Sequence, residues 1–307
     1  MHTDRFKKLT IHLVLAIGSI LMMYPLIFSL MGSITNTEDY LRSTWIPIPS
    51  TVFLNNYQAM FSAEMLPTLA KWMGVTTIRI VWFTFLPIIV AILCGYVFSR
   101  LKFRGREAAF LVILSSMLVP QIVFQVPLFV LMARWPLAGG NDWLGQGGTG
   151  FIGQLPALLL PGIVNAYFVF LMRQVFFGIP DDYEEAARLD GANTFQVLRY
   201  VYIPMLRSAI IVMVILNFVG IWNDYVWPLM VVGPNRDMWP VGLAFQKIMG
   251  GSFQIPDIGN LSSAGVSLVN IPLLLTAGAV VTIPPVLIFF IFQRYFIQGL
   301  QGIGLKG

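Results

Sequence analysis

The stretch IPDDYEEAARLDGANTFQVLRYVYIP, residues 179–204, is a polar and strongly charged segment set inside an otherwise apolar chain. Pro180 suits a first helical turn, and the acidic residues after it place negative charge at a helix N-terminus. Asp182 and Glu185 have the spacing of a capping box. The sequence therefore predicts that a short helix begins here.

Two further signals divide this segment. Gly191 is expected to end the first helix, because glycine readily adopts the left-handed conformation that follows a helix. Asn193 or Thr194 can cap a second short helix, which Pro204 is expected to end. The segment is therefore predicted to form two short helices joined at a glycine.

The first helix is predicted to be amphipathic. Glu184 and Arg188 lie four residues apart and form a favourable pair. Such a helix can lie in a groove of a soluble partner, and the alternative is that it packs on its own protein. Its apolar and small residues recur at helical spacing: Ile179, Tyr183, Ala186, Ala187 and Leu189.

Composition identifies what surrounds the segment. The 307 residues are 57% hydrophobic and 11% charged, with a mean hydropathy of +0.77, as expected for an integral membrane protein. Cys94 is the only cysteine, which excludes an internal disulfide. The net charge of +5 fits the cytoplasmic basic residues of a membrane protein better than nucleic-acid binding.

The apolar runs predict an all-α, polytopic membrane protein with six transmembrane helices in one domain, residues 1–307. The first run is longer than the roughly 7–15 apolar residues of a signal peptide, so it is expected to be a retained helix. The spans are expected at residues 9–34, 75–101, 108–133, 151–177, 205–232 and 270–293.

Basic residues predict the orientation. Thirteen of the 19 Lys and Arg residues fall on the side that holds residues 179–204 and both termini. Because cytoplasmic loops carry an excess of basic residues, this side is expected to be the cytoplasm. The compact loop from Arg100 to Arg106 adds four cationic side chains to it.

The order of residues in the opening segment resembles a known signature, the EAA motif of ABC importer permeases. Its elements here are Glu185-Ala186-Ala187, Gly191 and Val201-Tyr202-Ile203-Pro204, in which Val201 and Ile203 are conservative departures. Three stretches resemble a narrower group within this family, the carbohydrate-uptake permeases of the maltose and multiple-sugar type. They are EEAARLDGAN (184–193), WNDYVWPL (222–229) and the C-terminal FFIFQRYFIQGLQGIGLKG (289–307).

The resemblance implies a type I importer permease in a bacterial or archaeal cytoplasmic membrane. Its partners would be a second homologous permease, two ATPase subunits and an extracytoplasmic sugar-binding protein. ATP and Mg²⁺ would be bound by the ATPases, so this chain is expected to hold no cofactor or metal and not to be an enzyme. The residues expected to couple to the ATPases are Tyr183, Glu184, Glu185, Ala186, Ala187, Arg188, Asp190 and Gly191.

Polar and aromatic residues in the fifth predicted span are candidates for the substrate path. Aromatic faces and amide groups suit stacking and hydrogen bonding to a sugar, and the alternative is packing between helices. The candidates are Asn217, Trp222, Asn223 and Asp224.

The resemblance to permeases of the maltose type implies that the C-terminal tail reaches the ATPases, and the composition of the tail suits a segment ordered by a partner. Four glycines from Gly299 to Gly307 are too many for a stable helix, and the tail is too apolar at Ile303 and Leu305 for a simple solvated end. A disordered tail is the alternative.

Other classes of function fit the sequence less well. A secondary transporter would need paired ionisable residues or an inverted repeat near the midplane, and neither is evident. An intramembrane enzyme would need a nucleophile and base or metal ligands, whereas the chain has one Cys and two His. Within the ABC class, a permease for a non-sugar solute remains the alternative.

Overall fold

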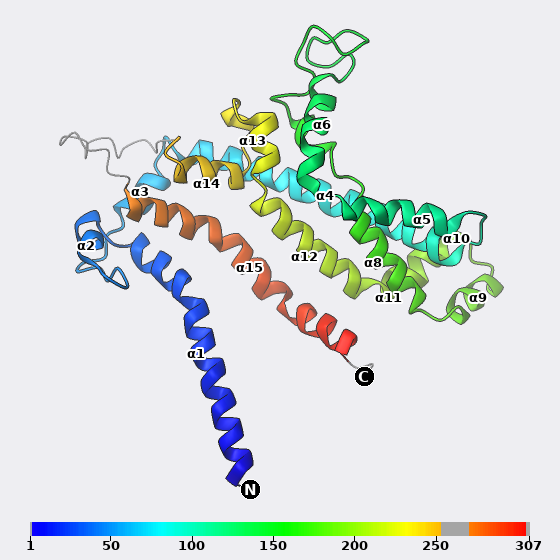
Figure 1. The fold of residues 1–307 in the computed structure, drawn as a ribbon, viewed down its shortest axis with the longest axis horizontal. Helices are drawn as coiled ribbons and strands as arrows, with labels where there is room; N and C mark the ends of the chain where they lie inside the picture. The colour runs from blue at the N-terminus through cyan, green and yellow to red at the C-terminus, as the bar shows by residue number, and fades with distance from the viewer. Residues whose placement is uncertain (1, 253–269, 305–307) are drawn as a thin grey trace. The chain divides into compact units, whose positions relative to one another are not determined.

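The computed structural model describes residues 2–252 and 270–304, and every regular element in these ranges is a helix (Figure 1). The all-α prediction is therefore confirmed for the described residues. The chain forms two compact units, which are Met1–Ala70 with Ala244–Pro284 and Lys71–Leu243 with Pro285–Gly307.

Three helices are long and apolar enough to cross a membrane. They are Lys7–Ser33 within α1 (His2–Ser33), α4 (Leu66–Arg100), and Ile271–Gln293 within α15 (Ile271–Gly304). They correspond to the first, second and sixth predicted spans, and α4 begins earlier than predicted.

Two further candidate membrane spans each consist of two helical segments that meet at a bend. The helices α5 (Arg106–Ser115) and η1 (Ser116–Leu118) meet α6 (Gln121–Ala133) at 98°. Pro120 stands at this break, where its missing N–H and the restricted residue before it prevent a continuous helix. The run Thr194–Met205 meets α12 (Arg207–Asn223) at 75°. Counting each bent pair as one span gives up to five, so the six-span layout stays a prediction.

The fourth and fifth predicted spans are each divided into two helices, and their boundaries as spans stay a prediction. The fourth consists of α7 (Leu155–Leu159) and α8 (Ala166–Phe177), separated at Pro161 and Gly162. The fifth is interrupted after Asn223, where Asp224 is extended, and the chain resumes as α13 (Val226–Val232). Hydropathy averaged over a long window does not detect such breaks, because the helices on either side of each break are apolar.

In the first unit, buried polar contacts join segments distant in sequence. Thr276 on α15 donates to the backbone carbonyl of Ser33 (3.0 Å), and the hydroxyl groups of Ser33 and Tyr57 are 2.8 Å apart. These contacts satisfy polar groups that are buried away from water. The short helices α2 (Thr37–Arg42) and α3 (Asn55–Met60) complete the polar stretch before α4.

In the second unit, an aromatic and aliphatic core joins four elements: α4, α8, α12 and the π-helix η2 (Val197–Tyr202). Ala91, Met172, Phe176, Tyr202 and Met213 are among its fully or almost fully buried members. The remaining helices of the described chain are α9 (Asp182–Leu189), α10 (Thr194–Gln196), α11 (Ile203–Met205), η3 (Arg236–Met238) and α14 (Val241–Met249).

The C-terminal part of α15 corrects one expectation. The helix continues through Gly304, although the glycines at its end were expected to prevent a helix. Each glycine costs about 1 kcal/mol relative to alanine, but a helix already formed over a long apolar run has no nucleation cost to meet. Leu305, the predicted anchor of the tail, lies outside the described residues, and Ile303 is described only as part of this helix.

Candidate functional site

The opening segment forms the two short helices that its sequence predicts. The first, α9, begins after Asp181, whose side chain does not cap it. The predicted capping box of Asp182 with Glu185 is therefore absent, because Asp182 already lies inside the helix. The acidic side chains of this first turn still favour the N-terminal end of the helix dipole.

The C-terminal end of α9 has the geometry of a Schellman motif. Gly191 has φ +85°, and its N–H donates to the carbonyl of Arg188 (3.0 Å). The N–H of Ala192 donates to the carbonyl of Ala187 (2.9 Å). These two bonds satisfy carbonyls that the helix end would otherwise leave unpaired. The predicted stop at Gly191 is confirmed.

The second helix also begins as predicted. Asn193 and Gln196 form a reciprocal capping box, with bonds of 2.9 and 2.8 Å between side chain and backbone. Pro204, however, does not end the helical run, which continues through Met205 before the 75° bend. The wider π-helical turn η2 lies immediately before Pro204, where an α-helical hydrogen bond to residue 200 is impossible without a proline N–H.

Glu184 binds α9 to the rest of the second unit. Its carboxylate accepts hydrogen bonds from the hydroxyl groups of Tyr96 on α4 (2.9 Å) and Tyr202 on η2 (2.6 Å). Arg188, one turn later, donates to the same carboxylate (2.7 Å) and to the Tyr96 hydroxyl oxygen (3.0 Å). Glu184 thereby links three helices through one side chain.

Arg100, the last residue of α4, holds the chain that enters α9. Its guanidinium donates to the carbonyls of Phe176 (2.7 Å) and Ile179 (2.5 Å) and forms an ion pair with Asp181. It also lies over the Tyr202 ring, 5.4 Å from the centroid. We name Glu184, Tyr96, Tyr202 and Arg100 the latch.

Glu184 of the latch and its ion-pair partner Arg188 are both charged at neutral pH. Burial opposes ionisation of Glu184, but hydrogen bonds from Tyr202, Arg188 and Tyr96 together outweigh it and lower the pKa of the carboxyl below its ordinary value. The hydrogen bond to Glu184 likewise raises the pKa of the Arg188 guanidinium. Both groups therefore keep their charges while α9 is docked.

The latch divides the predicted coupling residues into two sets. Glu184 and Ala187 face the protein's own core, and Arg188 and Gly191 take part in internal contacts. The side chains of α9 that face outward include Tyr183, Glu185, Ala186 and Leu189, with Asp190 beyond them. Leu189 is 89% exposed. Sequence reasoning left Leu189 out of the coupling set, although its spacing from Tyr183 and Ala186 places the three on one side of a helix.

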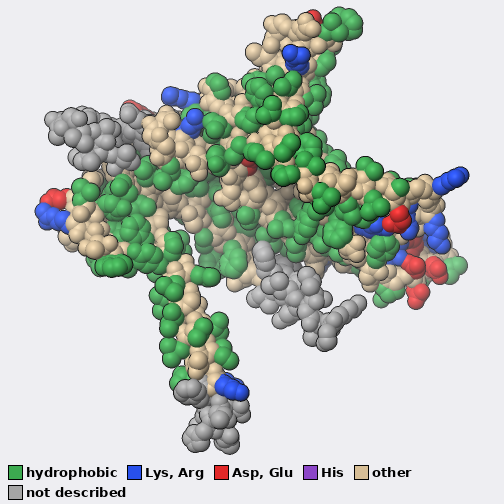
Figure 2. All heavy atoms as spheres, viewed as in Figure 1, with side chains coloured by type: hydrophobic (Ala, Val, Ile, Leu, Met, Phe, Trp, Pro, Cys, Tyr) green, Lys and Arg blue, Asp and Glu red, His purple; other side chains and the backbone are tan. Residues whose placement is uncertain are grey.

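Charged side chains are concentrated around α9 and α10. Figure 2 shows basic and acidic side chains gathered at the end of the second unit where α9 and α10 lie, whereas apolar side chains cover much of the helices on the same face. Beside the C-terminal end of α9 a hollow of about 260 Å³ is lined by Asp190, Gly191, Gln196 and Tyr200, among others. An exposed apolar helix face next to a hollow is suited to contact with another protein.

Asn217, a predicted path residue, has a structural partner. Its amide donates to the carbonyl of Phe83 on α4 (2.6 Å). Pro87 lies four residues after Phe83 and has no N–H, so this carbonyl lacks its usual helical donor. Trp227 likewise supplies a donor to a carbonyl that a proline leaves unpaired. Its indole N–H donates to the carbonyl of Ala157 (2.9 Å), four residues before Pro161.

The other predicted path residues surround the break after α12. Trp222 is buried and stacks on Phe218, with centroids 5.6 Å apart. Asn223 is exposed, and its amide donates to a carbonyl of its own helix. Asp224 forms an ion pair with Arg79 on α4 (2.5 Å). Arg79 is 1% exposed, and its Nε and Nη1 atoms have no hydrogen-bond partner among the residues that the structure describes.

Comparison with known proteins identifies relatives along almost the whole chain. Residues 87–302 match the family described as binding-protein-dependent transport system inner membrane component. The arabinooligosaccharides transport system permease of Halalkalibacterium halodurans is 30% identical over 295 residues, which cover 93% of this chain and 91% of that protein. The lactose transport system permease of Rhizobium radiobacter is 28% identical, with 97% and 96% covered. The sn-glycerol-3-phosphate transport system permease of Rhizobium meliloti is 25% identical, with 94% of each covered.

A solved structure has the same fold. It is described as a bacterial ABC transporter involved in the import of the acidic polysaccharide alginate, and the chain compared is 21% identical with a TM-score of 0.79. The match covers 96% of this chain and 98% of that one.

Proposed function

This chain belongs to the family of binding-protein-dependent transport system inner membrane components, and we propose that it is the permease subunit of a sugar importer. As a family member it is a membrane component of an ABC importer and not an enzyme. The proposal for sugar rests on relatives named for arabinooligosaccharides and lactose. It also rests on the exposed amide of Asn223 at the end of α12.

A phosphorylated polyol is a second candidate substrate, because a relative named for sn-glycerol-3-phosphate matches the chain over a similar length. The two candidates differ in charge. Uptake of a radiolabelled neutral oligosaccharide and of glycerol phosphate by cells carrying the complete transporter distinguishes them. Uptake of only the phosphate ester would contradict the sugar assignment.

The proposed assembly contains a second homologous permease, two ATPase subunits and an extracytoplasmic solute-binding protein. Its location is the cytoplasmic membrane with both termini inside, which the distribution of basic residues supports. Lipid surrounds the spans, and ATP and Mg²⁺ belong to the ATPases.

Coupling is assigned to the outward face of α9. Tyr183, Ala186 and Leu189 offer apolar contact to an ATPase, and Glu185 and Asp190 offer charge to basic side chains. The observation that carries this assignment is the latch, because a helix fixed to α4 and η2 can transmit a displacement as a lever. Glu184, Ala187, Arg188 and Gly191 act in this proposal by holding the lever, not by touching the partner.

Charge reversal tests the assignment. Glu185→Lys is expected to weaken ATPase binding at least tenfold, because repulsion replaces attraction at a contact. The exposed Glu185 side chain makes no hydrogen bond or ion pair with the described residues, so its replacement is not expected to unfold the chain. Glu64→Lys is the matched control, since Glu64 is also exposed and precedes α4 on the predicted outer side. Co-purification of the ATPases with each variant is the measurement. Equal recovery with both variants would contradict the assignment.

The substrate path is proposed to run past the break after α12, where Trp222, Asn223 and Asp224 lie together in sequence. Asn223→Ala is the most direct test, because the Asn223 side chain is exposed and, among the described residues, bonds only to its own helix. Transport is expected to fall while binding-protein-independent ATPase activity is retained. Unchanged transport would remove Asn223 from the path.

The tail is proposed to reach the ATPases through Ile303 and Leu305. Deleting Gly302 to Gly307 is expected to lower ATPase stimulation without affecting membrane insertion. A truncated complex that hydrolyses ATP like the full-length one would contradict this contact.

A further inference from the structure

The loop between α4 and α5 carries a basic cluster that the latch only partly uses. Arg100 is engaged by backbone carbonyls and Asp181, and Arg106 pairs with Glu107 (3.0 Å). Lys102 and Arg104 are exposed and make no hydrogen bond or ion pair within the described residues. Two cationic side chains are therefore left without a counter-charge from the part of the chain that the structure describes.

The carboxylate of Glu107, which directly follows this loop in sequence, is already neutralised. Both oxygens of Glu107 accept hydrogen bonds from the guanidinium of Arg173 (2.6 and 2.7 Å), a buried residue of α8. Arg173 is fixed by a further bond to the carbonyl of Phe98 (3.0 Å) and by the Phe110 ring, 3.9 Å from its centroid. Glu107 thus cannot balance Lys102 and Arg104 as well, and the loop keeps an excess of positive charge.

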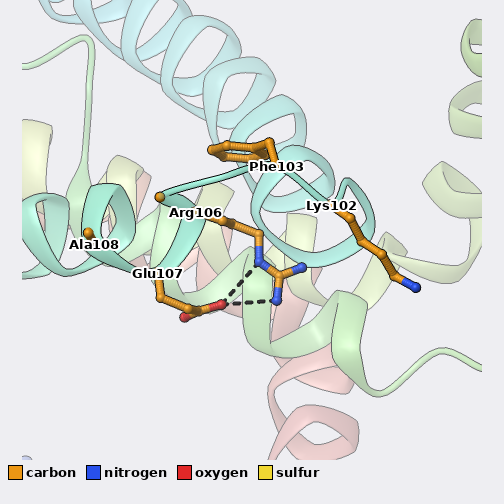
Figure 3. Close-up of a pocket in the computed structure, with 6 residues that line it drawn as sticks. Lys102, Phe103, Arg106, Glu107 and Ala108 are labelled. Atoms are coloured by element: carbon orange, nitrogen blue, oxygen red, sulfur yellow. Dashed lines mark hydrogen bonds and ion pairs between the residues drawn. The ribbon is translucent and has the colours of Figure 1, made fainter.

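The same loop is hollowed and partly apolar. A hollow of about 450 Å³ is lined by Lys102, Phe103, Arg106 and Glu107, among others (Figure 3). In the view of Figure 3, the charged ends of Lys102 and Arg106 extend to one side of the loop and the Phe103 ring lies on the other. Phe103 is 44% exposed, and Leu101 beside it is similarly exposed.

The loop between α4 and α5 is expected to lie at the surface of the membrane because of the helices that it connects. It connects α4, which ends at Arg100, to α5, which begins at Arg106, and both helices belong to candidate spans. On α5, Leu111 and Val112 are strongly exposed, as expected for side chains that meet acyl chains. A loop between two spans lies at the boundary of membrane and water, where aromatic and basic side chains meet headgroups.

We propose that the surface formed by Leu101, Lys102, Phe103, Arg104 and Arg106 binds an anionic phospholipid. Lys102 and Arg104 hold the phosphate and headgroup, and Phe103 and Leu101 contact the glycerol and upper acyl region. A free phosphate would use the charges alone, whereas a phospholipid also uses the exposed apolar side chains. The proposal rests on the orientation proposed above, in which this loop faces the cytoplasmic leaflet.

Lipid retention by the purified transporter tests the proposal. Wild type and Lys102→Gln/Arg104→Gln complexes are reconstituted with phosphatidylglycerol or phosphatidylcholine, and native mass spectrometry counts the lipids that remain bound. Each basic residue near an anionic surface contributes about 1 kcal/mol, or about fivefold in affinity. The double variant is expected to hold phosphatidylglycerol about thirtyfold more weakly, and phosphatidylcholine equally poorly in both proteins.

Three controls make the result decisive. Lys102→Arg/Arg104→Lys keeps both charges and is expected to retain the lipid. Arg134→Gln removes an exposed basic residue at the end of α6 that has no described partner and is expected to change nothing. In the wild type, retention is expected to fall with added salt, which gives a result even if the double variant folds poorly.

Several outcomes would overturn the proposal. Equal phosphatidylglycerol retention by the double variant and the wild type is one. Stabilisation by inorganic phosphate as great as by phosphatidylglycerol would show a free-anion site instead. Loss of ATPase subunits without loss of lipid would place the loop against a protein. None of these measurements depends on transport or on Glu185, so failure here is distinguishable from failure of the coupling assignment.

Discussion

Glu184 is the side chain on which the attachment of α9 depends most directly. Glu184→Gln keeps an oxygen acceptor but removes the charge that attracts Arg188 and strengthens the bonds from Tyr96 and Tyr202. Hydrogen bonds to charged groups contribute about 1.5–3 kcal/mol each, so we expect the complex to lose about 1–3 kcal/mol of stability. ATPase binding is expected to persist, because the outward face is unchanged, while transport per ATP falls. Thermal unfolding and coupled transport assays measure both.

The stabilisation by Glu184 also depends on pH. Its pKa is lowered in the folded protein, so its contribution is fully present above the unfolded value of about 4.3 and is lost as pH falls through the lower folded value. The difference in melting temperature between wild type and Glu184→Gln is expected to be constant near neutral pH and to shrink below about pH 4. Glu185→Gln is the matched control, because that carboxylate makes none of the latch contacts. A difference that grows on acidification would contradict the role of the ionised carboxylate.

Asn217 illustrates a residue whose type suggested a substrate contact but whose amide satisfies the backbone. Asn217→Leu would leave the Phe83 carbonyl buried without a donor, at a cost of about 1–3 kcal/mol. Pro87→Ala restores an N–H that can bond to this carbonyl. We therefore expect Asn217→Leu to be less destabilising in the Pro87→Ala background. A double-mutant cycle by thermal unfolding measures the difference, and strict additivity would show that Asn217 does not serve this carbonyl.

At the level of helices, the joint at Gly191 sets where α9 ends. Gly191 has φ +85° and open space where a Cβ would stand, so Gly191→Ala meets a backbone cost of about 1 kcal/mol but no clash. Gly191→Pro cannot adopt this φ and loses the N–H that bonds to Arg188. We expect Gly191→Ala to retain most transport and Gly191→Pro to abolish it while the protein stays in the membrane. Transport assays on membranes with equal permease content test this order, and equal effects of both changes would contradict it.

Elements with local causes were predictable from the sequence. Gly191 and Asn193 act on neighbours within a few residues, so the end of α9 and the start of α10 are confirmed. The partners of Glu184 and Asn217 were not predictable, because Tyr96 is 88 residues from Glu184 and Phe83 is 134 residues from Asn217. The sequence shows which side chains need partners, but only the packing of α4 against η2 and α12 shows which partners they find.

The breaks in the predicted spans have a common consequence for the fold. Prolines in or beside the membrane helices remove backbone donors, and side chains of other helices replace them, as Asn217 and Trp227 do. Such bonds tie the broken segments to intact ones. The second unit therefore keeps interrupted spans in place by contacts distant in sequence, which hydropathy alone does not reveal.

The ion pair between Arg79 and Asp224 is expected to stabilise the packing of the second unit, and variants of the two residues test this expectation. It joins the middle of α4 to the break after α12, and Arg79 has no other described partner for two of its nitrogens. Asp224→Asn would leave a buried guanidinium without its counter-charge, which costs about 3–5 kcal/mol. Arg79→Met/Asp224→Leu removes both charges, and replacement of a buried pair by apolar side chains is often neutral.

We therefore expect Asp224→Asn to lower the yield and melting temperature of the assembled complex, and the double variant to recover most of both. Size-exclusion chromatography and thermal unfolding of the purified complexes measure these quantities. Transport separates the two functions of Asp224: a double variant that assembles but does not transport would place Asp224 in the substrate path as well as in the fold. A double variant as unstable as Asp224→Asn would contradict the account, because the defect would then come from lost shape and not from an unpaired charge.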